Sequence, residues 1–341
     1  MVGFNRLPVG SLLIVVAGLC VVAAAVRAVN RPARRAQLKD LGGKIEVRLD
    51  GKLFTEYRYE GYAKPILYPI IGPGGVPMTR NYPMKKGVKG EATDHPHHTS
   101  LWYTHGDVNG HDFWLTGKGR GKIVQDGAVK VVAGDGLAAI RTRNKWVAAN
   151  GKVQCTDERT IAFPPVDGGR AIDYEITIKA SEGDVTFGDT KEGTMAIRTN
   201  PVLRVTGPLA RGKCCNSEGI KGKGIWGKRA RWVDYWAPID PSADSGQAGK
   251  TVGVAIFDHP SNPRHPTRWH ARTYGLVTAN PFGLHHFAGK PKGAGNMTIK
   301  AGKSVTFRYR FLFHSGDVKQ AGIAERYEEF AKTKRPAGSG R

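Results

Sequence analysis

Regularly spaced turn residues divide the stretch from Gly121 to Ala180 into short extended segments, and this spacing constrains the fold more than any other feature of the chain. The breaks fall at Asp126-Gly127, 134–136, Asn150-Gly151 and 167–169. Short segments that are separated by Gly- or Asn-containing turns are typical of an antiparallel meander. The sequence therefore predicts a mostly β protein.

A β-hairpin is predicted just after residue 43. Ile45, Val47 and Leu49 alternate with polar residues, and Asp50-Gly51 supplies a tight turn before the extended pattern resumes at Leu53. Further strands are expected at 185–189, 194–199, 251–258 and 304–314, and the Gly-rich stretch 207–228 is expected to be a long loop.

One helix is predicted, from Asp317 to about Lys334. Ile323, Tyr327 and Phe330 recur at helical spacing, and Asp317 is placed to cap the helix start. The fold class that follows is a large antiparallel β-sandwich with one C-terminal α-helix.

The N-terminal residues 1–28 have the layout of a secretory signal peptide. Arg6 precedes an apolar run from Leu12 to Val26, and small residues surround Arg27. The run is shorter than the roughly 20 residues that span a bilayer, although an uncleaved N-terminal anchor is the alternative. We expect periplasmic or secreted protein, a basic flexible linker at 29–43, a single domain at 44–334, a disordered tail at 335–341 and no later membrane span.

The chain carries a formal net charge of +23, which falls to +21 when Arg6 and Arg27 are removed with the signal peptide. Lys and Arg are scattered over turns and strand faces, and no recognisable nucleic-acid module accompanies them. We therefore expect no nucleic-acid partner. Anionic polymers of the cell envelope are the expected surroundings for such a surface.

Three cysteines remain after export: Cys155, Cys214 and Cys215. An oxidising compartment permits one disulfide, and Cys155 is expected to pair with one of the two adjacent cysteines.

The densest polar cluster starts at Asp94-His95-Pro96-His97-His98 and continues through His105, Asn109, His111 and Asp112 to Trp114. Two kinds of chemistry fit these residues. His95, His97 and His105 with Asp94 or Asp112 form a candidate ligand set for a divalent transition metal. Alternatively, single histidines transfer protons near neutral pH without any cofactor.

A second group of histidines lies far along the chain. It includes His259, Trp269-His270 and Asn280, again beside Pro and Trp residues. A tryptophan among polar side chains can stack on the apolar face of a sugar ring. We expect the two groups to fold together into one cleft.

Glu192 and Arg80 complete the candidate site. Glu192 ends a predicted strand and is a candidate base or acid, although an exposed hairpin glutamate is the commoner case. Arg80 is expected either to bind a substrate or to form an ion pair within its own loop.

Several motifs together resemble one bacterial family. They include Gly72-Pro73-Gly74-Gly75, Asp94-His95-Pro96-His97-His98, Asp112-Phe113-Trp114, Lys191-Glu192-Gly193 and Asn280-Pro281-Phe282-Gly283. This set is similar to the exported family of planctomycetes and relatives that is labelled methane oxygenase PmoA, over residues 44–330. Methane oxidation is not expected. The family takes its label from a membrane subunit that spans the bilayer several times, whereas this chain has one apolar segment, at its N-terminus.

The resemblance implies a supersandwich similar to that of galactose mutarotases, where a histidine and a carboxylate move protons on a sugar. The first hypothesis is thus an exported carbohydrate-active enzyme, an epimerase, lyase or hydrolase acting on a sugar or uronate. Its proton-transfer groups would be His97, His98, His270 and Glu192. Its substrate-binding residues would be Arg80, His105, Asn109, Asp112, Trp114, His259, Trp269 and Asn280. The alternatives are a metal-dependent enzyme and a non-catalytic glycan-binding protein.

Overall fold

A computed structural model describes residues 1–3, 36–134, 137–239 and 250–334. The chain divides into two units, 1–32 and 33–341, and the strands below all belong to the second. The predicted signal peptide and the predicted tail at 335–341 lie outside the described residues, apart from Met1 to Gly3. No helix among the described residues is long and apolar enough to cross a membrane.

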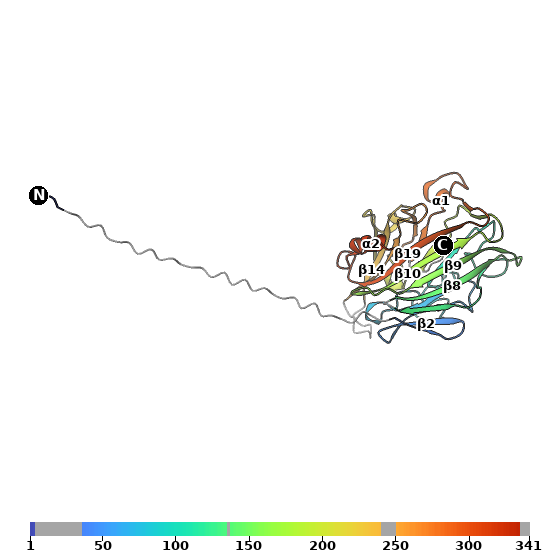
Figure 1. The fold of residues 1–341 in the computed structure, drawn as a ribbon, viewed down its shortest axis with the longest axis horizontal. Coiled ribbons are helices and arrows are strands. Elements are labelled where there is room, and N and C mark those ends of the chain that lie inside the picture. The colour runs from blue at the N-terminus through green and yellow to red at the C-terminus, as the bar shows by residue number, and fades with distance from the viewer. Residues whose placement is uncertain (4–35, 135–136, 240–249, 335–341) are drawn as a thin grey trace. The chain divides into compact units, whose positions relative to one another are not determined.

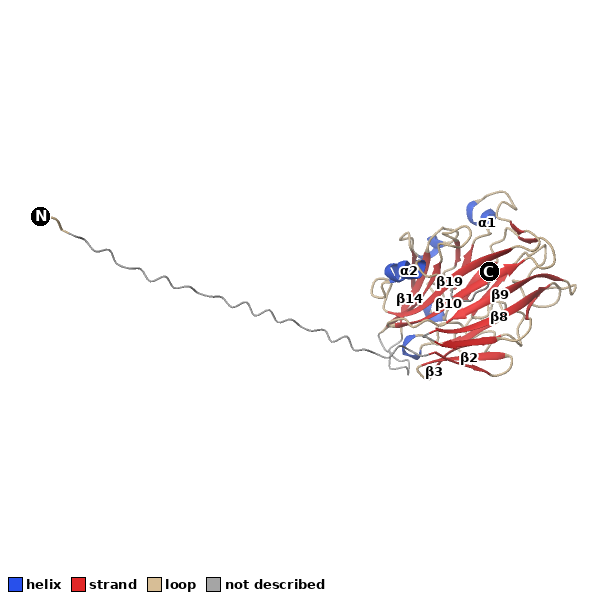
Figure 2. Ribbon diagram, in the orientation of Figure 1, coloured by secondary structure: helices blue, strands red, loops and turns tan. Residues whose placement is uncertain are grey.

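The described chain is built mainly of antiparallel strands (Figures 1 and 2). The eight-stranded sheet has the order β1 (Ala36–Asp40), β2 (Lys44–Leu49), β3 (Lys52–Arg58), β4 (Ile66–Ile70), β5 (Leu101–His105), β12 (Gly193–Arg198), β17 (Leu276–Asn280) and β16 (Arg268–Ala271). The nine-stranded sheet has the order β13 (Lys213–Asn216), β14 (Trp232–Pro238), β15 (Thr251–Asp258), β19 (Ser304–Ser315), β10 (Gly169–Lys179), β9 (Val153–Ala162), β8 (Leu137–Val147) and β6 (Lys122–Gln125), and β7 (Lys130–Gly134) also pairs with β8. A small third sheet pairs β11 (Val185–Phe187) with β18 (Met297–Ile299).

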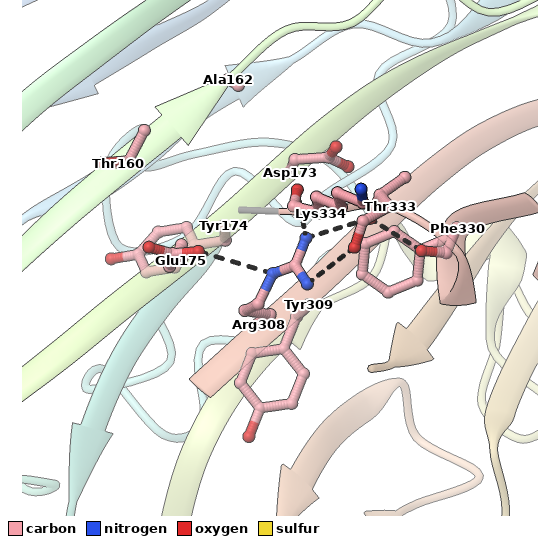
Figure 3. A pocket seen from close by; sticks show the side chains of 10 residues that line it. All are labelled: Thr160, Ala162, Asp173, Tyr174, Glu175, Arg308, Tyr309, Phe330, Thr333 and Lys334. Atoms are coloured by element: carbon pink, nitrogen blue, oxygen red, sulfur yellow. Dashed lines mark hydrogen bonds and ion pairs between the residues drawn. The ribbon is translucent and has the colours of Figure 1, made fainter. Parts of the chain in front are cut away.

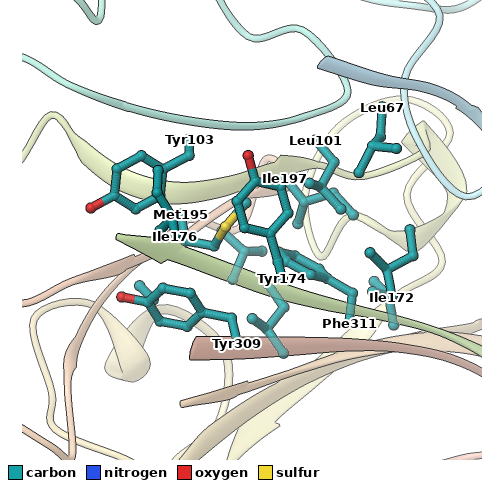
Figure 4. Packing of buried hydrophobic residues seen from close by; sticks show 14 of the residues in the cluster. Leu67, Leu101, Tyr103, Ile172, Tyr174, Ile176, Met195, Ile197, Tyr309 and Phe311 are labelled. Atoms are coloured by element: carbon teal, nitrogen blue, oxygen red, sulfur yellow. The ribbon is translucent and has the colours of Figure 1, made fainter. Parts of the chain in front are cut away.

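The two large sheets pack face to face around one hydrophobic core. Leu101 and Tyr103 of β5 point into it from one sheet, and Ile172, Tyr174 and Ile176 of β10 point into it from the other (Figure 4). Side chains alternate between the two faces of a strand, so Trp102 points away from this core. The predicted antiparallel β-sandwich is confirmed.

The predicted hairpin and meander are confirmed in segments whose sequence contains typical turn-forming residues. The hairpin of β2 and β3 turns at Asp50 and Gly51, whose φ angles of 52° and 75° lie in the left-handed region. Asp tolerates this region and Gly adopts it at little cost, so the pair fits the turn. The meander is confirmed in β8, β9 and β10, which are consecutive in the chain and adjacent in the sheet.

The helix prediction needs correction at its start. The helix α2 covers Ile323–Ala331, and a second short helix, α1, covers Leu284–Ala288. The carboxylate of Asp317 accepts hydrogen bonds from the amides of Lys319 and Gln320, which closes a separate turn. Gly322 then adopts a φ of 58°, so the helix begins after it.

Two loop predictions also need correction. The segment 207–228 contains β13 and the short 3-10 helix Gly222–Ile225, because Lys213–Asn216 pairs along β14 at the sheet edge. The linker expected at 29–43 ends early, because Ala36–Asp40 forms β1 and pairs with β2.

The predicted disulfide is wrong. All three described cysteines are free and buried. Cys155 lies in β9 and its expected partners lie in β13, with four strands between them in the same sheet. Five strand spacings amount to about 24 Å, whereas a disulfide needs Cα atoms within about 7 Å.

Candidate functional site

Three segments meet on the outer face of the eight-stranded sheet, the face that Trp102 shares. They are the loop 94–98 before β5, the residues Lys191 and Glu192 before β12, and the turn 272–275 between β16 and β17. The rings of His95 and Tyr274 stack at 5.8 Å between centroids, and Glu192 interacts electrostatically with His95 and Arg272. We call this group the histidine site; its members are Asp94, His95, His97, His98, Glu192, Arg272 and Tyr274.

Stacked rings form the floor of the histidine site. The His98 ring lies between His95 at 4.7 Å and Trp102 at 5.5 Å, and Trp114 approaches it at 5.7 Å. His98 is only 1% exposed, and burial followed by the nearby His97 and Arg198 lowers its pKa far below the usual range. His98 is therefore a neutral packing residue, whereas the sequence suggested a proton-transfer group.

His97 is half-buried and sits edge-on against His98 at 4.5 Å. Burial, followed by the charges of Lys64 and His95, lowers its pKa to about 4. Its ring nitrogens have no hydrogen-bond partner among the described residues. At neutral pH His97 is thus uncharged and able to bind a substrate hydroxyl, but it is not a proton donor.

Asp94 and His95 form an oriented pair at the surface of the histidine site. The Nδ1 atom of His95 lies 2.6 Å from Oδ2 of Asp94, and both side chains are 42% exposed. Burial raises the pKa of Asp94, but Arg198, the hydrogen bond from His95 and Arg80 together hold it below its ordinary value. An ionised Asp94 fixes a proton on Nδ1 and leaves Nε2 of His95 free to accept one. The sequence suggested His95 as a metal ligand, and the contact with Asp94 also makes it a candidate base.

Arg80 holds this loop in place from below. Its guanidinium donates to Oδ1 of Asp94 at 2.6 Å and to the carbonyl oxygens of Tyr82, Ala92 and His95. The side chain is only 1% exposed. Arg80 thus forms the ion pair within its own loop, which was the expected alternative to substrate binding.

Glu192 brings a second carboxylate to the histidine site. The amide of Gly106 donates to its carbonyl oxygen at 2.7 Å, and a Cβ at position 106 would lie 2.9 Å from the Cβ of Glu192. Burial raises the pKa of Glu192 above its ordinary value, although Lys191 and His95 partly oppose the shift. Its carboxylate has no hydrogen bond or ion pair with any residue that the structure describes.

His270 supports the segment that carries Glu192. Its Nδ1 atom lies 2.9 Å from the carbonyl oxygen of Lys191, and burial lowers its pKa to about 4. Strand register places His270, Thr278, Ala196 and Trp102 in one row across the outer face. His270 therefore shares a face with the first histidine group, but three strand spacings, about 14 Å, separate it from the Trp102 position.

Lys64 is a site residue that sequence reasoning missed. Its Nζ atom donates to the carbonyl oxygen of His97 at 3.1 Å and lies 5.6 Å from the Trp102 ring centroid. Burial lowers its pKa to about 7, with Asp112 opposing the shift. Arg198, Arg272 and Tyr274 were missed as well. The sequence around a lysine or arginine in a polar stretch does not indicate that its side chain lies at a functional site.

The predicted metal set does not come together. His105 is fully buried on the opposite face of β5, where its ring packs against Phe187 and Phe282 and Nε2 lies 2.8 Å from the carbonyl oxygen of Gly188. His105 therefore cannot share an ion with His95 and His97. In the part of the chain that the structure describes, no three His, Cys, Asp or Glu side chains are arranged to hold a metal ion.

Two expected sugar-binding residues lie elsewhere. Trp269 is buried between the sheets and donates from Nε1 to the carbonyl oxygen of Ala230. His259 lies on the nine-stranded sheet, where it contacts Phe330 of α2 and the guanidinium of Arg308. The second histidine group is thus divided between the sheets, and His270 and Asn280 are its members on the face of the histidine site.

The remaining expected residues hold loop backbone or pack in the interior. Asn109 and Asn280 bind loop amides and carbonyls, and Asp112 accepts from the amides of Trp114 and Leu115. Trp114 is 1% exposed and belongs to the packed floor, so it offers no stacking surface.

A separate pocket on the nine-stranded sheet is lined by residues that include Arg308 (Figure 3). Arg308 donates there to the carbonyl oxygens of Thr333 and Lys334, and its Nε lies 3.4 Å from Glu175. These contacts attach the end of α2 to the sheet, so we assign this pocket a structural role.

The lowered histidine pKa values predict loss of stability in mild acid. His97, His105 and His270 have an ordinary pKa of 6.5 and a folded-state pKa of about 4. Between these values the unfolded chain binds protons that the folded chain does not, so stability falls as the pH falls through this window.

We expect Tm at pH 5 to be at least about 5 °C lower than at pH 7. The measurement is calorimetry at constant ionic strength. His105→Gln removes one of these groups and should flatten the decrease, whereas an unchanged Tm from pH 7 to pH 5 would contradict the argument.

Comparison with known proteins matches a family profile described as Family of unknown function (DUF6807) to residues 44–328. None of the curated proteins compared matches the chain significantly. Similar solved structures include the galactosidase domain of an alpha-galactosidase–sucrose kinase, with a TM-score of 0.38 and 7% identity over 83% of this chain and 41% of that chain. A polysaccharide lyase has a TM-score of 0.31 and 11% identity over 84% and 33%.

A proposed aldose 1-epimerase from Escherichia coli K12 has a TM-score of 0.28 and 12% identity over 82% of this chain and 98% of that chain. This chain spans less than half of the first two structures, 41% and 33% of their chains. TM-scores this low carry no inference about the present chain.

Proposed function

This chain belongs to the Family of unknown function (DUF6807), and we propose that it is an exported carbohydrate-active enzyme that performs metal-independent acid–base chemistry at the histidine site. Glu192 and His95 are the proton-transfer groups in this proposal. Oxygenase chemistry forms no part of it.

One observation carries the proposal: an oriented histidine and an unpaired, half-buried carboxylate belong to the same site. Asp94 leaves Nε2 of His95 free to accept a proton, and burial gives Glu192 a raised pKa, so that it holds a proton to a higher pH than an exposed carboxylate. Two titratable groups in different environments are the usual arrangement for an acid and a base at one site. Such a pair can remove a proton from one side of a substrate and supply one elsewhere.

The surroundings of the pair favour a sugar as the substrate class. Tyr274 is a partly buried aromatic ring at the site, and the half-buried His97 has free ring nitrogens. Free ring nitrogens and charged side chains suit the hydroxyl edges of a sugar ring.

The proposal is tested by incubating the purified protein in D2O with neutral aldoses, neutral oligosaccharides and uronate-containing oligosaccharides. Proton NMR detects exchange of a C–H proton, epimerisation, elimination or hydrolysis. We expect one of these reactions, and we expect the Glu192 substitution described in the Discussion to abolish it. Glycan retention without any product would instead identify a non-catalytic binding protein.

Export is a second part of the proposal. Residues 1–28 combine Arg6, an apolar run and small residues near Arg27, which is the layout of a cleaved leader. We expect the full-length gene product to be recovered from the periplasm or medium with an intact mass that lacks these residues. Full-length mass in the membrane fraction would identify an N-terminal anchor, and full-length mass in the cytoplasm would contradict export.

A further inference from the structure

The charges around Glu192 are unbalanced. Its electrostatic neighbours are Lys191, His95 and Arg272, with Asp112 as the one carboxylate among them. Asp112 already accepts from two backbone amides and pairs with Arg120 at 2.9 Å. The site therefore carries more positive than negative side chains, and this excess favours the binding of an anionic group.

Arg272 and Lys191 are the two cations beside Glu192 whose side chains have no hydrogen bond or ion pair with the described residues, and of these only Arg272 carries a planar guanidinium. Among the described residues, its guanidinium has no carboxylate or carbonyl partner, and it lies 5.4 Å from the ring centroid of Tyr274. Nearby arginines differ in this respect, because Arg198 pairs with Asp94 and Arg268 donates to the carbonyl oxygen of Gly227. The guanidinium of Arg272 is half-exposed and free to bind a ligand.

The backbone at Arg272 is held on both sides. Its amide donates to the carbonyl oxygen of Leu276 at 2.8 Å, and its carbonyl oxygen accepts from the amide of Gly275 at 2.9 Å and from the hydroxyl of Tyr235 at 3.3 Å. A fixed backbone and an aromatic ring under the guanidinium reduce the conformational entropy that the side chain loses when it binds an anion.

We propose that the substrate is a uronate-containing glycan whose carboxylate is bound by Arg272 beside Glu192. A planar guanidinium accommodates a carboxylate through two parallel hydrogen bonds. A single negative charge on the substrate would be balanced by Arg272. This inference rests on the proposed function, because it names the substrate class of the same site.

The test compares carboxylated glycans with counterparts in which the carboxylate is reduced to a neutral hydroxymethyl group. Oligosaccharides of polygalacturonate, alginate and hyaluronan are each assayed beside their carboxyl-reduced, neutral counterparts and beside a sulfated glycan that lacks carboxylates. We expect turnover of at least one carboxylated glycan and at least about tenfold higher KM for its reduced counterpart, because a hydrogen-bonded charge pair is lost.

The variant Arg272→Gln should raise KM for the carboxylated substrate at least about tenfold while leaving KM for the reduced counterpart unchanged. A structural role would impair both substrates equally, so this split separates binding from folding. Arg272→Lys should restore part of the affinity. Arg231→Gln, which removes an exposed arginine that directly precedes β14 and pairs with Glu328 of α2, is the control and should change neither KM.

Equal turnover of carboxylated and reduced glycans, or turnover of neutral or sulfated glycans alone, would overturn the inference and leave the acid–base function intact. Absence of both binding and product for every glycan, charged and neutral, would overturn the proposed function together with the inference.

Discussion

Replacing Glu192 with Gln lowers kcat at least about 100-fold, because a positioned acid or base typically contributes that much or more to the rate. The substitution keeps the size of the side chain and removes only its ability to ionise. Because the Glu192 carboxylate has no protein partner among the described residues, no ion pair is broken and Tm should change by less than about 2 °C. Steady-state kinetics and calorimetry on the same preparation measure both quantities.

The matched control for Glu192 is Glu182→Gln, an exposed glutamate in the turn before β11. It should leave kcat and Tm unchanged. The pH profile of the wild-type enzyme identifies the role of Glu192: kcat rises with pH through the pKa of a base and falls through the pKa of an acid. A kcat for Glu192→Gln within about threefold of wild type would exclude proton transfer by this residue.

Replacing Arg159 with Met destabilises the protein by about 3–5 kcal/mol, which is the usual cost of removing one partner from a buried ion pair. Arg159 and Asp157 are both 0% exposed. Arg159 donates from Nε and Nη2 to the two oxygens of Asp157 at 2.9 and 2.8 Å, and from Nη1 to the hydroxyl of Tyr174 at 2.9 Å. The variant leaves a buried carboxylate with only neutral partners.

Urea unfolding measures this effect through the midpoint concentration. The control is Lys179→Met, which removes the exposed partner of Glu158 and should cost less than about 1 kcal/mol. Equal midpoints for the two variants would show that the core tolerates an unpaired Asp157, against the argument from burial.

The sequence identified the location of the site better than the role of each residue. The segment 94–98 was singled out because five adjacent residues combine a carboxylate with three histidines, and the Asp94–His95 contact is made within that segment. The structure buries His98 and Arg80, and burial decides whether a polar side chain can meet a substrate. Burial depends on side chains that come from distant strands.

Sequence alone determined the hairpin of β2 and β3, the meander of β8 to β10, the tight turn at Asp50-Gly51 and the sandwich class, because the period-2 pattern and the left-handed turn are properties of neighbouring residues. Tertiary structure alone decided which groups share the histidine site. The order β5, β12, β17 in one sheet brings Glu192 and Arg272 to His95 across gaps of about 100 to 180 residues. The same alternation that places Trp102 under the site turns His105 to the core, so strand register separated residues that looked like one cluster in the chain.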